Sequence, residues 1–393
     1  MTLISNNMQI DWRKVVIFGA GKIGRSFVGQ LFSRSGYEVV FIDINSTLID
    51  ALNRKRQYRV IIKSDRTVET LVIENVRGVK LVDSDKAMNE LATSGVAALA
   101  VGQQGLSEAL PVIAKALLRR MDFFGRVPLD FIICENLRNA DQVVADGLVK
   151  LLPGQFPFDE MVGLVETSIG KMVPIMTRKD LEEDPLQVFA EPYNSLIVSK
   201  SGFKNPIPPV ENLAPKENIK AWVDRKLFIH NLGHATAAYL GFKKHPEATF
   251  MYEIFEDTGI EAATRATMQQ SAGILRALYP GEFTAEQLNE HIEDLLQRFR
   301  NRALGDTVYR VGCDLYRKLG PGDRLAAPIE AAIQMKQPYQ LIMKALEAAV
   351  SFRATDEYGK HLPSDIAFYK EAEKGLDYVL REICGLPGGA IPR

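Results

Sequence analysis

The sequence predicts an α/β protein, in which an N-terminal Rossmann-type doubly wound sheet is followed by a C-terminal, mainly α-helical domain. Three observations lead to this fold class. The chain has 393 residues, which is enough for two domains of ordinary size. Short apolar segments of strand length alternate with helical segments through the first half of the chain. After about residue 200, long helical patterns replace them. We expect a dinucleotide-binding domain over residues 1–204 and a helical substrate domain over residues 205–393.

The first predicted unit is a strand, a glycine-rich turn, a helix and a second strand. KVVIF, residues 14–18, is short, apolar and rich in β-branched residues, as a buried strand would be. A helical stretch over 25–35 follows the turn and ends at Gly36, and the strand YEVVFID ends at Asp43. This order is a βαβ unit.

The same alternation continues beyond Asp43. Helical patterns cover 46–55 and 85–94, and strand patterns cover 58–63, 67–76, 95–102 and 128–136. A mostly parallel sheet with helices on both faces follows from this alternation. The stretch 203–220 holds four prolines and is predicted to be a linker. Helical patterns then cover 218–240, 247–278, 285–302 and 341–354.

The composition is that of a globular cytoplasmic protein, with 46% hydrophobic and 25% charged residues. The 48 basic and 49 acidic residues give a net charge of −1, so nucleic acid and anionic membrane are not expected as partners. No signal peptide or membrane-spanning stretch is visible. The three cysteines fit neither a metal site nor a disulfide framework. We expect a monomer or weak dimer that binds a small molecule.

The turn FGAGKIGR predicts a dinucleotide site. Gly19, Gly21 and Gly24 form G-x-G-x-x-G between a predicted strand and helix, which is the context that gives this short pattern its meaning. Gly19 permits the tight turn, Gly21 lets the backbone approach a pyrophosphate, and Gly24 lets helix and strand pack closely. Lys22 and Ile23 lie in the same turn and are further candidates for cofactor contacts. Free N–H groups at the start of the helix would hold the phosphates.

The expected cofactor is NAD. Asp43 ends the second strand about 20 residues after the glycines, where its carboxylate can bond both ribose hydroxyls and repel a ribose phosphate. Val101 and Gly102 begin a loop at the end of another strand, and Asn136 follows a third strand. Ligands bind beyond the carboxyl ends of parallel strands, so both loops are candidates, although simple turn chemistry explains them equally well.

The stretch RKLFIHNLGHA, residues 225–235, is the catalytic candidate. On an α-helix, Lys226 and His230 nearly stack, His234 continues the row and Asn231 flanks it. Gly233 would leave room for a ligand beside this row. When an alcohol is oxidised, hydride leaves the carbinol carbon and a base must take the hydroxyl proton, while other groups stabilise the oxyanion.

A lysine can be that base if burial and neighbouring positive charge lower its pKa. Asn231 and Asn136 could donate to the oxyanion, and His234 could orient the hydroxyl. No ligand set with the spacing of a zinc dehydrogenase is present, so no metal is expected. The alternative is structural, with a solvated lysine and packed histidines.

A third cluster lies in YRVGCDLYRKLGPGDR. Arg310 and Lys318 are eight residues apart, slightly over two helical turns, and could bind substrate hydroxyls or a phosphate from a shared face. Spacing alone favours a plainer explanation, in which charges at helix ends pair with Asp314 and Asp323.

Four motifs in this order, FGAGKIGR, CEN, RKLFxxNxGHAxxAYLG and RKLxxGDR, resemble the long-chain, zinc-independent polyol dehydrogenases. The similarity runs from about residue 15 to 353. The resemblance implies a Rossmann domain with a helical substrate domain, and interconversion of a polyol or polyol phosphate with a ketose, or of a uronate equivalent, using NAD(H) or NADP(H). It implies Lys226 as acid/base, Asn136 and Asn231 as oxyanion donors and His234 as the residue that positions the reacting oxygen. It also places Arg310 and Lys318 at the substrate.

One departure concerns the substrate. The family usually has V-D-R-I-x-P where this chain has IGKMVP, residues 169–174, so Gly170 replaces an acidic residue. Loss of that carboxylate lessens repulsion of an anion, which suits oxidation of mannitol 1-phosphate to fructose 6-phosphate. The alternatives are an unphosphorylated polyol 2-dehydrogenase, a tagaturonate or fructuronate reductase, a decarboxylating dehydrogenase of the 6-phosphogluconate type, and a non-catalytic NAD-sensing protein.

Overall fold

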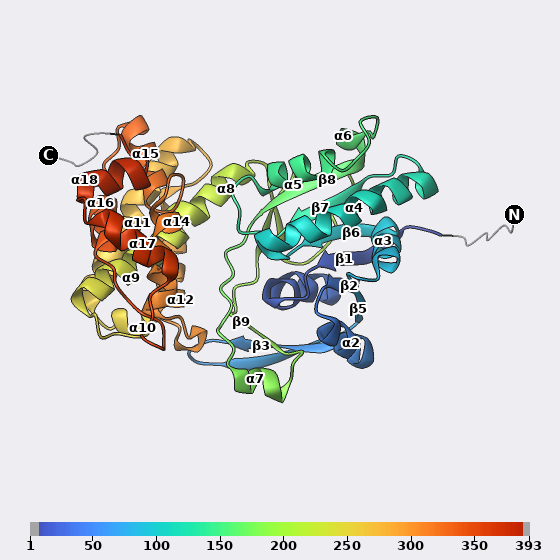
Figure 1. Ribbon diagram of the computed structural model, residues 1–393, viewed down its shortest axis with the longest axis horizontal. Helices are drawn as coiled ribbons and strands as arrows, with labels where there is room; N and C mark the ends of the chain where they lie inside the picture. Colours follow the sequence, from blue (N-terminus) through green and yellow to red (C-terminus); the bar gives the residue numbers. More distant parts are fainter. Residues whose placement is uncertain (1–7, 388–393) are drawn as a thin grey trace, which may run out of the picture. The chain divides into compact units, whose positions relative to one another are not determined.

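The computed structural model describes residues 8–387 and forms two compact units, Met1–Ile219 and Lys220–Arg393. The first unit contains a largely parallel sheet covered by helices, and the second is built from helices, so the predicted fold class is confirmed (Figure 1). Strand β11 (Leu213–Lys216) lies in the expected linker but pairs with β10 (Leu196–Ser199). This pairing groups residues up to Ile219 with the first unit, while the boundary between 204 and 205 stays a prediction.

The main sheet has eight strands in the order β11-β10-β8-β7-β6-β1-β2-β5. The six central and outer strands are β1 (Asp11–Phe18), β2 (Glu38–Asp43), β5 (Val76–Lys80), β6 (Ser94–Leu99), β7 (Leu129–Ile133) and β8 (Val162–Ser168). All six run parallel, and only the β8–β10 pair is antiparallel. The chain starts at β1, builds outwards through β2 to β5 and then returns to β6 on the other side of β1. The strand order therefore reverses between β1 and β6.

Both faces of this sheet are buried, which is why its strands are nearly continuous apolar runs. Along β1, Val15 and Ile17 pack into one core, whereas Val16 and Phe18 pack into another. Helical residues from η1 (Gly24–Gly29), α1 (Gln30–Arg34) and α2 (Ser46–Lys55) complete the first core. The second is completed by α3 (Ser84–Ala92), α4 (Gly102–Phe124) and α5 (Ala140–Val149).

A separate three-stranded sheet has the order β4-β3-β9. Strands β3 (Tyr58–Lys63) and β4 (Val68–Ile73) form an antiparallel pair, and β9 (Val188–Ala190) runs parallel to β3. The strands expected at 58–63 and 67–76 are present as β3 and β4, but they form an antiparallel pair outside the main sheet. Only four residues separate these strands, and a parallel connection needs a dozen or more. The short helices α6 (Phe158–Met161) and α7 (Arg178–Glu183) complete the first unit.

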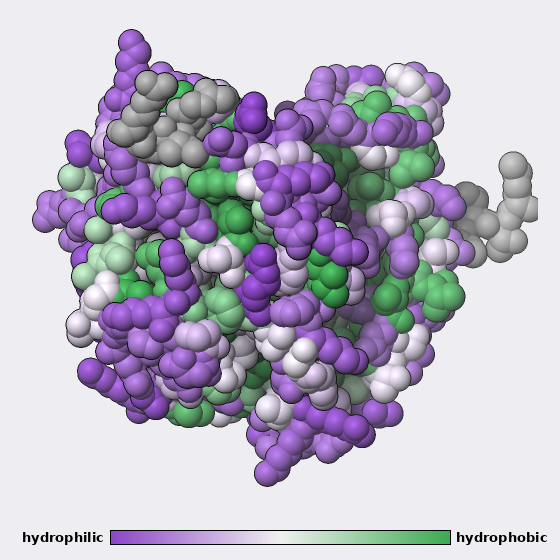
Figure 2. Space-filling view, turned by 60° about the vertical axis from the view of Figure 1, so that its left-hand side comes forward, coloured by the Kyte–Doolittle hydropathy of each residue, from purple (hydrophilic) through white to green (hydrophobic). Residues whose placement is uncertain are grey.

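The second unit is helical throughout its described part, apart from one isolated bridge between Phe250 and Thr307. Its longer helices are α9 (Leu232–Lys244), α11 (Thr258–Leu278), α12 (Ala285–Phe299), α15 (Ala326–Met335), α16 (Gln340–Val350) and α17 (Pro363–Ala372). The shorter ones are α8 (Ile219–Arg225), η2 (Lys226–Asn231), α10 (Met251–Ile254), η3 (Arg302–Leu304), α13 (Val308–Gly312), α14 (Leu315–Leu319), α18 (Leu376–Tyr378) and η4 (Val379–Ile383). On the face shown in Figure 2, hydrophilic residues predominate and hydrophobic residues appear in separate groups.

Candidate active site

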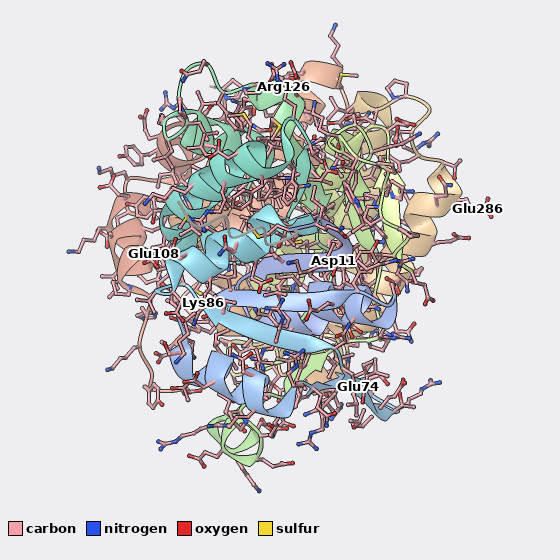
Figure 3. The ribbon with its side chains drawn as sticks, turned by 90° about the vertical axis from the view of Figure 1, so that its right-hand side faces the viewer. Asp11, Glu74, Lys86, Glu108, Arg126 and Glu286 are labelled. Atoms are coloured by element: carbon pink, nitrogen blue, oxygen red, sulfur yellow. The ribbon has the colours of Figure 1, made fainter. Side chains whose placement is uncertain are left out.

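A cavity of about 250 Å³ lies at the point where the strand order reverses. Its lining includes Gly19 and Gly21 after β1, Asp43 at the end of β2 and Val101 after β6. Glu108, labelled in Figure 3, contributes from α4. Open α/β sheets bind ligands in the crevice at such a switch point, because two neighbouring loops diverge there. The structure thus brings together four of the residues predicted to contact the cofactor.

The three glycines of the turn meet different surroundings. Gly19 has φ +96°, and a Cβ there would lie 2.3 Å from the carbonyl oxygen of Ala100. A Cβ on Gly24 would lie 1.9 Å from the carbonyl oxygen of Gly19, so only glycine lets η1 pack this closely on the turn. Gly21 has nothing within 4 Å of that position, which leaves its backbone open to a ligand. Lys22 is exposed, and Ile23 packs against the first core; neither lines the cavity.

Asp43 fastens the turn as well as lining the cavity. Its Oδ2 accepts a hydrogen bond from the N–H of Ala20 at 2.6 Å, and its Oδ1 accepts one from the N–H of Asn45 at 2.8 Å. Each carboxylate oxygen can accept more than one hydrogen bond, so the ribose role predicted for Asp43 is compatible with these contacts.

Glu135, the middle residue of the CEN motif, has a structural role that was not predicted from the sequence. Its Oε1 accepts hydrogen bonds from the N–H groups of Val101 and Gly102, at 2.8 and 3.1 Å. Burial raises the pKa of Glu135, and these two hydrogen bonds oppose the shift. The carboxylate therefore ties the end of β7 to the loop that carries Val101. Asn136, the next residue, is exposed. In the sequence, the signal for Glu135 is its place beside Asn136 in the CEN motif.

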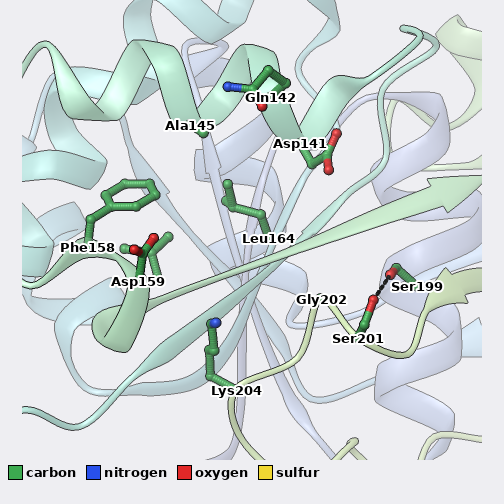
Figure 4. Close-up of a pocket in the computed structure, with 11 residues that line it drawn as sticks. Asp141, Gln142, Ala145, Phe158, Asp159, Leu164, Ser199, Ser201, Gly202 and Lys204 are labelled. Carbon is green, nitrogen blue, oxygen red and sulfur yellow. Dashed lines mark hydrogen bonds between the residues drawn. The ribbon is translucent and has the colours of Figure 1, made fainter. Parts of the chain in front are cut away.

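A second cavity, of about 330 Å³, is lined by residues of α5, β8 and the segment after β10 (Figure 4). Val162 and Leu164, in its wall, lie at the start of β8, and Ser199 and Ser201 are paired at 3.3 Å. This is the opposite end of the sheet from the switch-point cavity. Because ligands bind at the carboxyl ends of parallel strands, we do not assign the active site to it.

The catalytic stretch of the second unit differs from the predicted α-helix in its first turn. Residues Lys226–Asn231 form the π-helix η2, and α9 continues from Leu232. A π turn holds more residues than an α turn. Lys226 is therefore about one turn away from both His230 and Asn231, rather than from His230 alone. Such widened turns occur often at functional sites.

Lys226 has the electrostatic character expected of a proton carrier. Burial and the nearby guanidinium of Arg324 lower its pKa to about 8, while Asp323 opposes the shift. Arg324 itself is anchored by Asp323, whose Oδ1 accepts a hydrogen bond from its Nε at 2.9 Å. Arg324 is the last residue of the stretch YRVGCDLYRKLGPGDR, and its effect on Lys226 depends on tertiary structure.

His234 lies in a fixed position. Its ring stacks on that of Phe299 with the centroids 4.5 Å apart and an angle of 4° between the planes. Burial lowers the pKa of His234 to about 4, which keeps the ring neutral near pH 7. His230 is buried and its ring centroid lies 5.6 Å from that of Phe299, as a packing residue would. The predicted free space beside Gly233 is absent, because a Cβ there would lie 2.5 Å from Sδ of Met268. The glycine instead lets α11 pack closely against α9.

Arg310 and Lys318 are adjacent but do not share one helix. Arg310 lies on α13 and Lys318 on α14, and the chain turns between them at Asp314, which has φ +72°. Lys318 Nζ donates to the carbonyl oxygens of Arg310 and Val311 at 3.2 and 2.9 Å, which leaves one ammonium hydrogen for a ligand. Burial, with Arg324 nearby, lowers the pKa of Lys318 to about 8. Arg310 is half-exposed and pairs with Asp306.

The segment that departs from the family pattern is held from within the first unit. Lys171 Nζ donates to the carbonyl oxygen of Tyr193 at 2.7 Å and to Oδ1 of Asn194 at 2.9 Å. Tyr193 also lies 3.5 Å from the position a Cβ on Gly170 would take. A small side chain would thus fit at residue 170 only in contact with that ring.

Residues 8–387 contain no group of three or more His, Cys, Asp or Glu side chains placed to hold a metal ion. None of the helices in this part of the chain combines the length and apolarity needed to span a membrane.

The glycine turn at a switch-point cavity, with a helical second unit, defines a two-domain protein of the dinucleotide-binding class. Two family profiles cover most of the chain: the mannitol dehydrogenase Rossmann domain matches residues 13–212, and the mannitol dehydrogenase C-terminal domain matches residues 218–378. The chain belongs to the mannitol dehydrogenase family, which confirms the resemblance drawn from the motifs.

Solved structures agree in fold. Mannitol 2-dehydrogenase from Pseudomonas fluorescens, in a ternary complex with NAD and D-mannitol, has 18% identity and a TM-score of 0.73, over 100% of this chain and 90% of that one. D-sorbitol dehydrogenase in substrate-free form has 16% identity and a TM-score of 0.79, over 97% and 90%.

Proposed function

We propose that this protein is an NAD-dependent, metal-independent dehydrogenase that interconverts mannitol 1-phosphate and fructose 6-phosphate, a mannitol-1-phosphate 5-dehydrogenase. The observation that carries the proposal is the lysine of the family motif, Lys226, whose pKa is lowered to about 8 beside Asn231 and His234. Such a lysine can take and return a proton near neutral pH, which is what alcohol oxidation and ketose reduction require.

Four features of the first unit support NAD as the cofactor. A dinucleotide fits at the switch-point cavity because the backbone at Gly21 is open to a ligand, because positions 19 and 24 leave no room for a side chain, and because Asp43 supplies a carboxylate. Glu108 adds a second carboxylate to the lining, and two carboxylates disfavour the extra phosphate of NADP. Bound NAD would supply the hydride acceptor for the carbinol carbon.

The chain's own residues would handle the proton and the oxygen. In oxidation, neutral Lys226 accepts the hydroxyl proton, and in reduction its ammonium returns it. The amide of Asn231 donates to the developing oxyanion, and the family motif assigns the same role to Asn136. His234, neutral and held against Phe299, positions the substrate.

Phosphate specificity is the finer part of the proposal. Gly170 brings no carboxylate to a position where the family usually has one, and Arg310 and Lys318 add positive charge. Arg310 is half-exposed, and its guanidinium, paired with Asp306 on one side, keeps further N–H groups for a phosphate, since forked N–H groups match phosphate oxygens. The names of the two solved relatives favour the alternative, an unphosphorylated polyol 2-dehydrogenase.

The test is NADH oxidation with fructose 6-phosphate, fructose and tagaturonate, each compared by kcat/KM. Preference for the phosphate supports the proposal, and preference for fructose or tagaturonate assigns the chain to a polyol 2-dehydrogenase or a uronate reductase. Carbon dioxide release with 6-phosphogluconate would mark the decarboxylating class. NADH binding without turnover of any sugar would favour an NAD-sensing protein.

A further inference from the structure

Asp306 is a buried carboxylate that joins two residues of the proposed site. It lies just before α13, with 5% of its side chain exposed. Its Oδ1 pairs with the guanidinium of Arg310 one helical turn on, and its Oδ2 lies 3.6 Å from Nε2 of His234. Among residues 8–387, neither Nε2 of His234 nor Oδ2 of Asp306 has a hydrogen-bond partner, and both atoms are buried.

Two buried polar atoms this close, without other partners, carry a cost that is removed if they bond to each other. The distance is only slightly longer than a hydrogen bond, and catalytic hydrogen bonds often tighten when the substrate binds. A neutral imidazole has one N–H and one lone pair, and a neighbouring carboxylate draws the N–H towards itself. The ring of His234 is neutral near pH 7, because its pKa is lowered to about 4 by burial, against the opposing effect of Asp306.

We propose that Asp306 is a positioning residue that holds the proton of His234 on Nε2 and so presents Nδ1 as an acceptor for a substrate hydroxyl next to the reacting one, whose own proton goes to Lys226. This inference rests on the proposed function for its substrate. Phe299 fixes the plane of the ring by stacking, and Asp306 fixes which nitrogen carries the proton. Its second oxygen holds Arg310, so one carboxylate sets the positions of two substrate-facing side chains.

The chain offers a matched control. Asp257 makes the same kind of pair with His245, Oδ2 to Nε2 at 2.7 Å, in the same helical unit. Its other oxygen accepts hydrogen bonds from the N–H groups of Gly259 and Ile260 at the start of α11, so Asp257 has a structural role. Asp257→Asn therefore removes an equivalent charge without touching His234.

The first experiment is nitrogen NMR of histidine-labelled protein, which reports the tautomer of each ring. The chain has five histidines, and His234→Gln identifies the required signal. We expect the proton on Nε2 in the native chain, a loss of that tautomer in Asp306→Asn, and no change at His234 in Asp257→Asn. A proton on Nδ1 in the native chain, or an unchanged His234 signal in Asp306→Asn, would overturn the inference.

The second experiment is a double-mutant cycle with the best sugar substrate. Asp306→Asn should lower kcat by about a hundredfold, within the range of acid–base and positioning effects, while NADH affinity stays constant. In the His234→Gln background the same substitution should cost little more. Equal losses in both backgrounds would show that Asp306 does not act through His234. Absence of turnover in the native chain would contradict the proposed function, whereas the NMR result judges this inference independently.

Discussion

Replacing Lys226 by methionine keeps most of the length of the side chain and removes the proton carrier. With a pKa of about 8, about one tenth of Lys226 is neutral at pH 7 and about nine tenths at pH 9. At the ordinary value of 10.5 the neutral fraction at pH 7 would be about 300-fold smaller. Oxidation needs the neutral amine, so its rate should rise about tenfold from pH 7 to pH 9. Reduction needs the ammonium and should fall over the same interval.

The assay follows NADH absorbance in both directions across this pH range. Lys226→Met should lower kcat by about 10²–10⁴-fold and leave NADH affinity intact. Arg324→Gln removes the neighbouring positive charge and should move the midpoint of both profiles upwards. Lys243→Ala, an exposed lysine on α9, is the matched control and should change nothing. A midpoint near 10.5 in the native chain, or substantial turnover by Lys226→Met, would contradict the role of Lys226 as the proton carrier.

Three further predictions concern the cofactor and the absence of a metal. Asp43→Asn should raise KM for NADH by about tenfold or more and reduce the preference for NADH over NADPH, since a hydrogen bond to a charged acceptor is worth about 1.5–3 kcal/mol. An unchanged preference for NADH would contradict the role of Asp43 in binding the ribose. Glu135→Ala should raise KM for NADH because the N–H groups of Val101 and Gly102 lose their acceptor, whereas Glu135→Gln should leave KM nearly unchanged. Equal effects of the two substitutions would contradict a role for these hydrogen bonds in NADH binding. Dialysis against a chelator should leave turnover unchanged, and loss of activity restored by zinc would contradict the proposed chemistry.

Much of the first unit follows from local sequence patterns. The strand β1, the glycine turn and the strand β2 are specified within residues 11–43, and the apolar strands indicate burial on both faces. The pairing of β3 with β4 could be mistaken for parallel continuation because strand patterns do not state their partner. Strand β11 was hidden in a proline-rich stretch, where Pro215 is tolerated at the edge of the sheet.

The site was predictable in its residues rather than in its geometry. The spacing of Lys226, Asn231 and His234 shows in the sequence, but the π turn that places them depends on packing against other helices. The charge of Arg324 beside Lys226 and the contact of Asp306 with His234 join positions about 100 and 70 residues apart, which no local periodicity reveals. At Gly233 the sequence pattern predicted space for a ligand that the structure does not contain, because Met268 fills it.

To test the proposed reaction, the protein is incubated with NAD and mannitol 1-phosphate, beside unphosphorylated mannitol, and the sugar formed with the NADH is identified. We expect fructose 6-phosphate in equal amount to NADH, with mannitol turned over at least about a hundredfold less efficiently, as loss of a phosphate held by charged groups implies. Fructose formed from mannitol at equal or greater efficiency would contradict phosphate recognition, and no NADH from either polyol would contradict the assigned reaction.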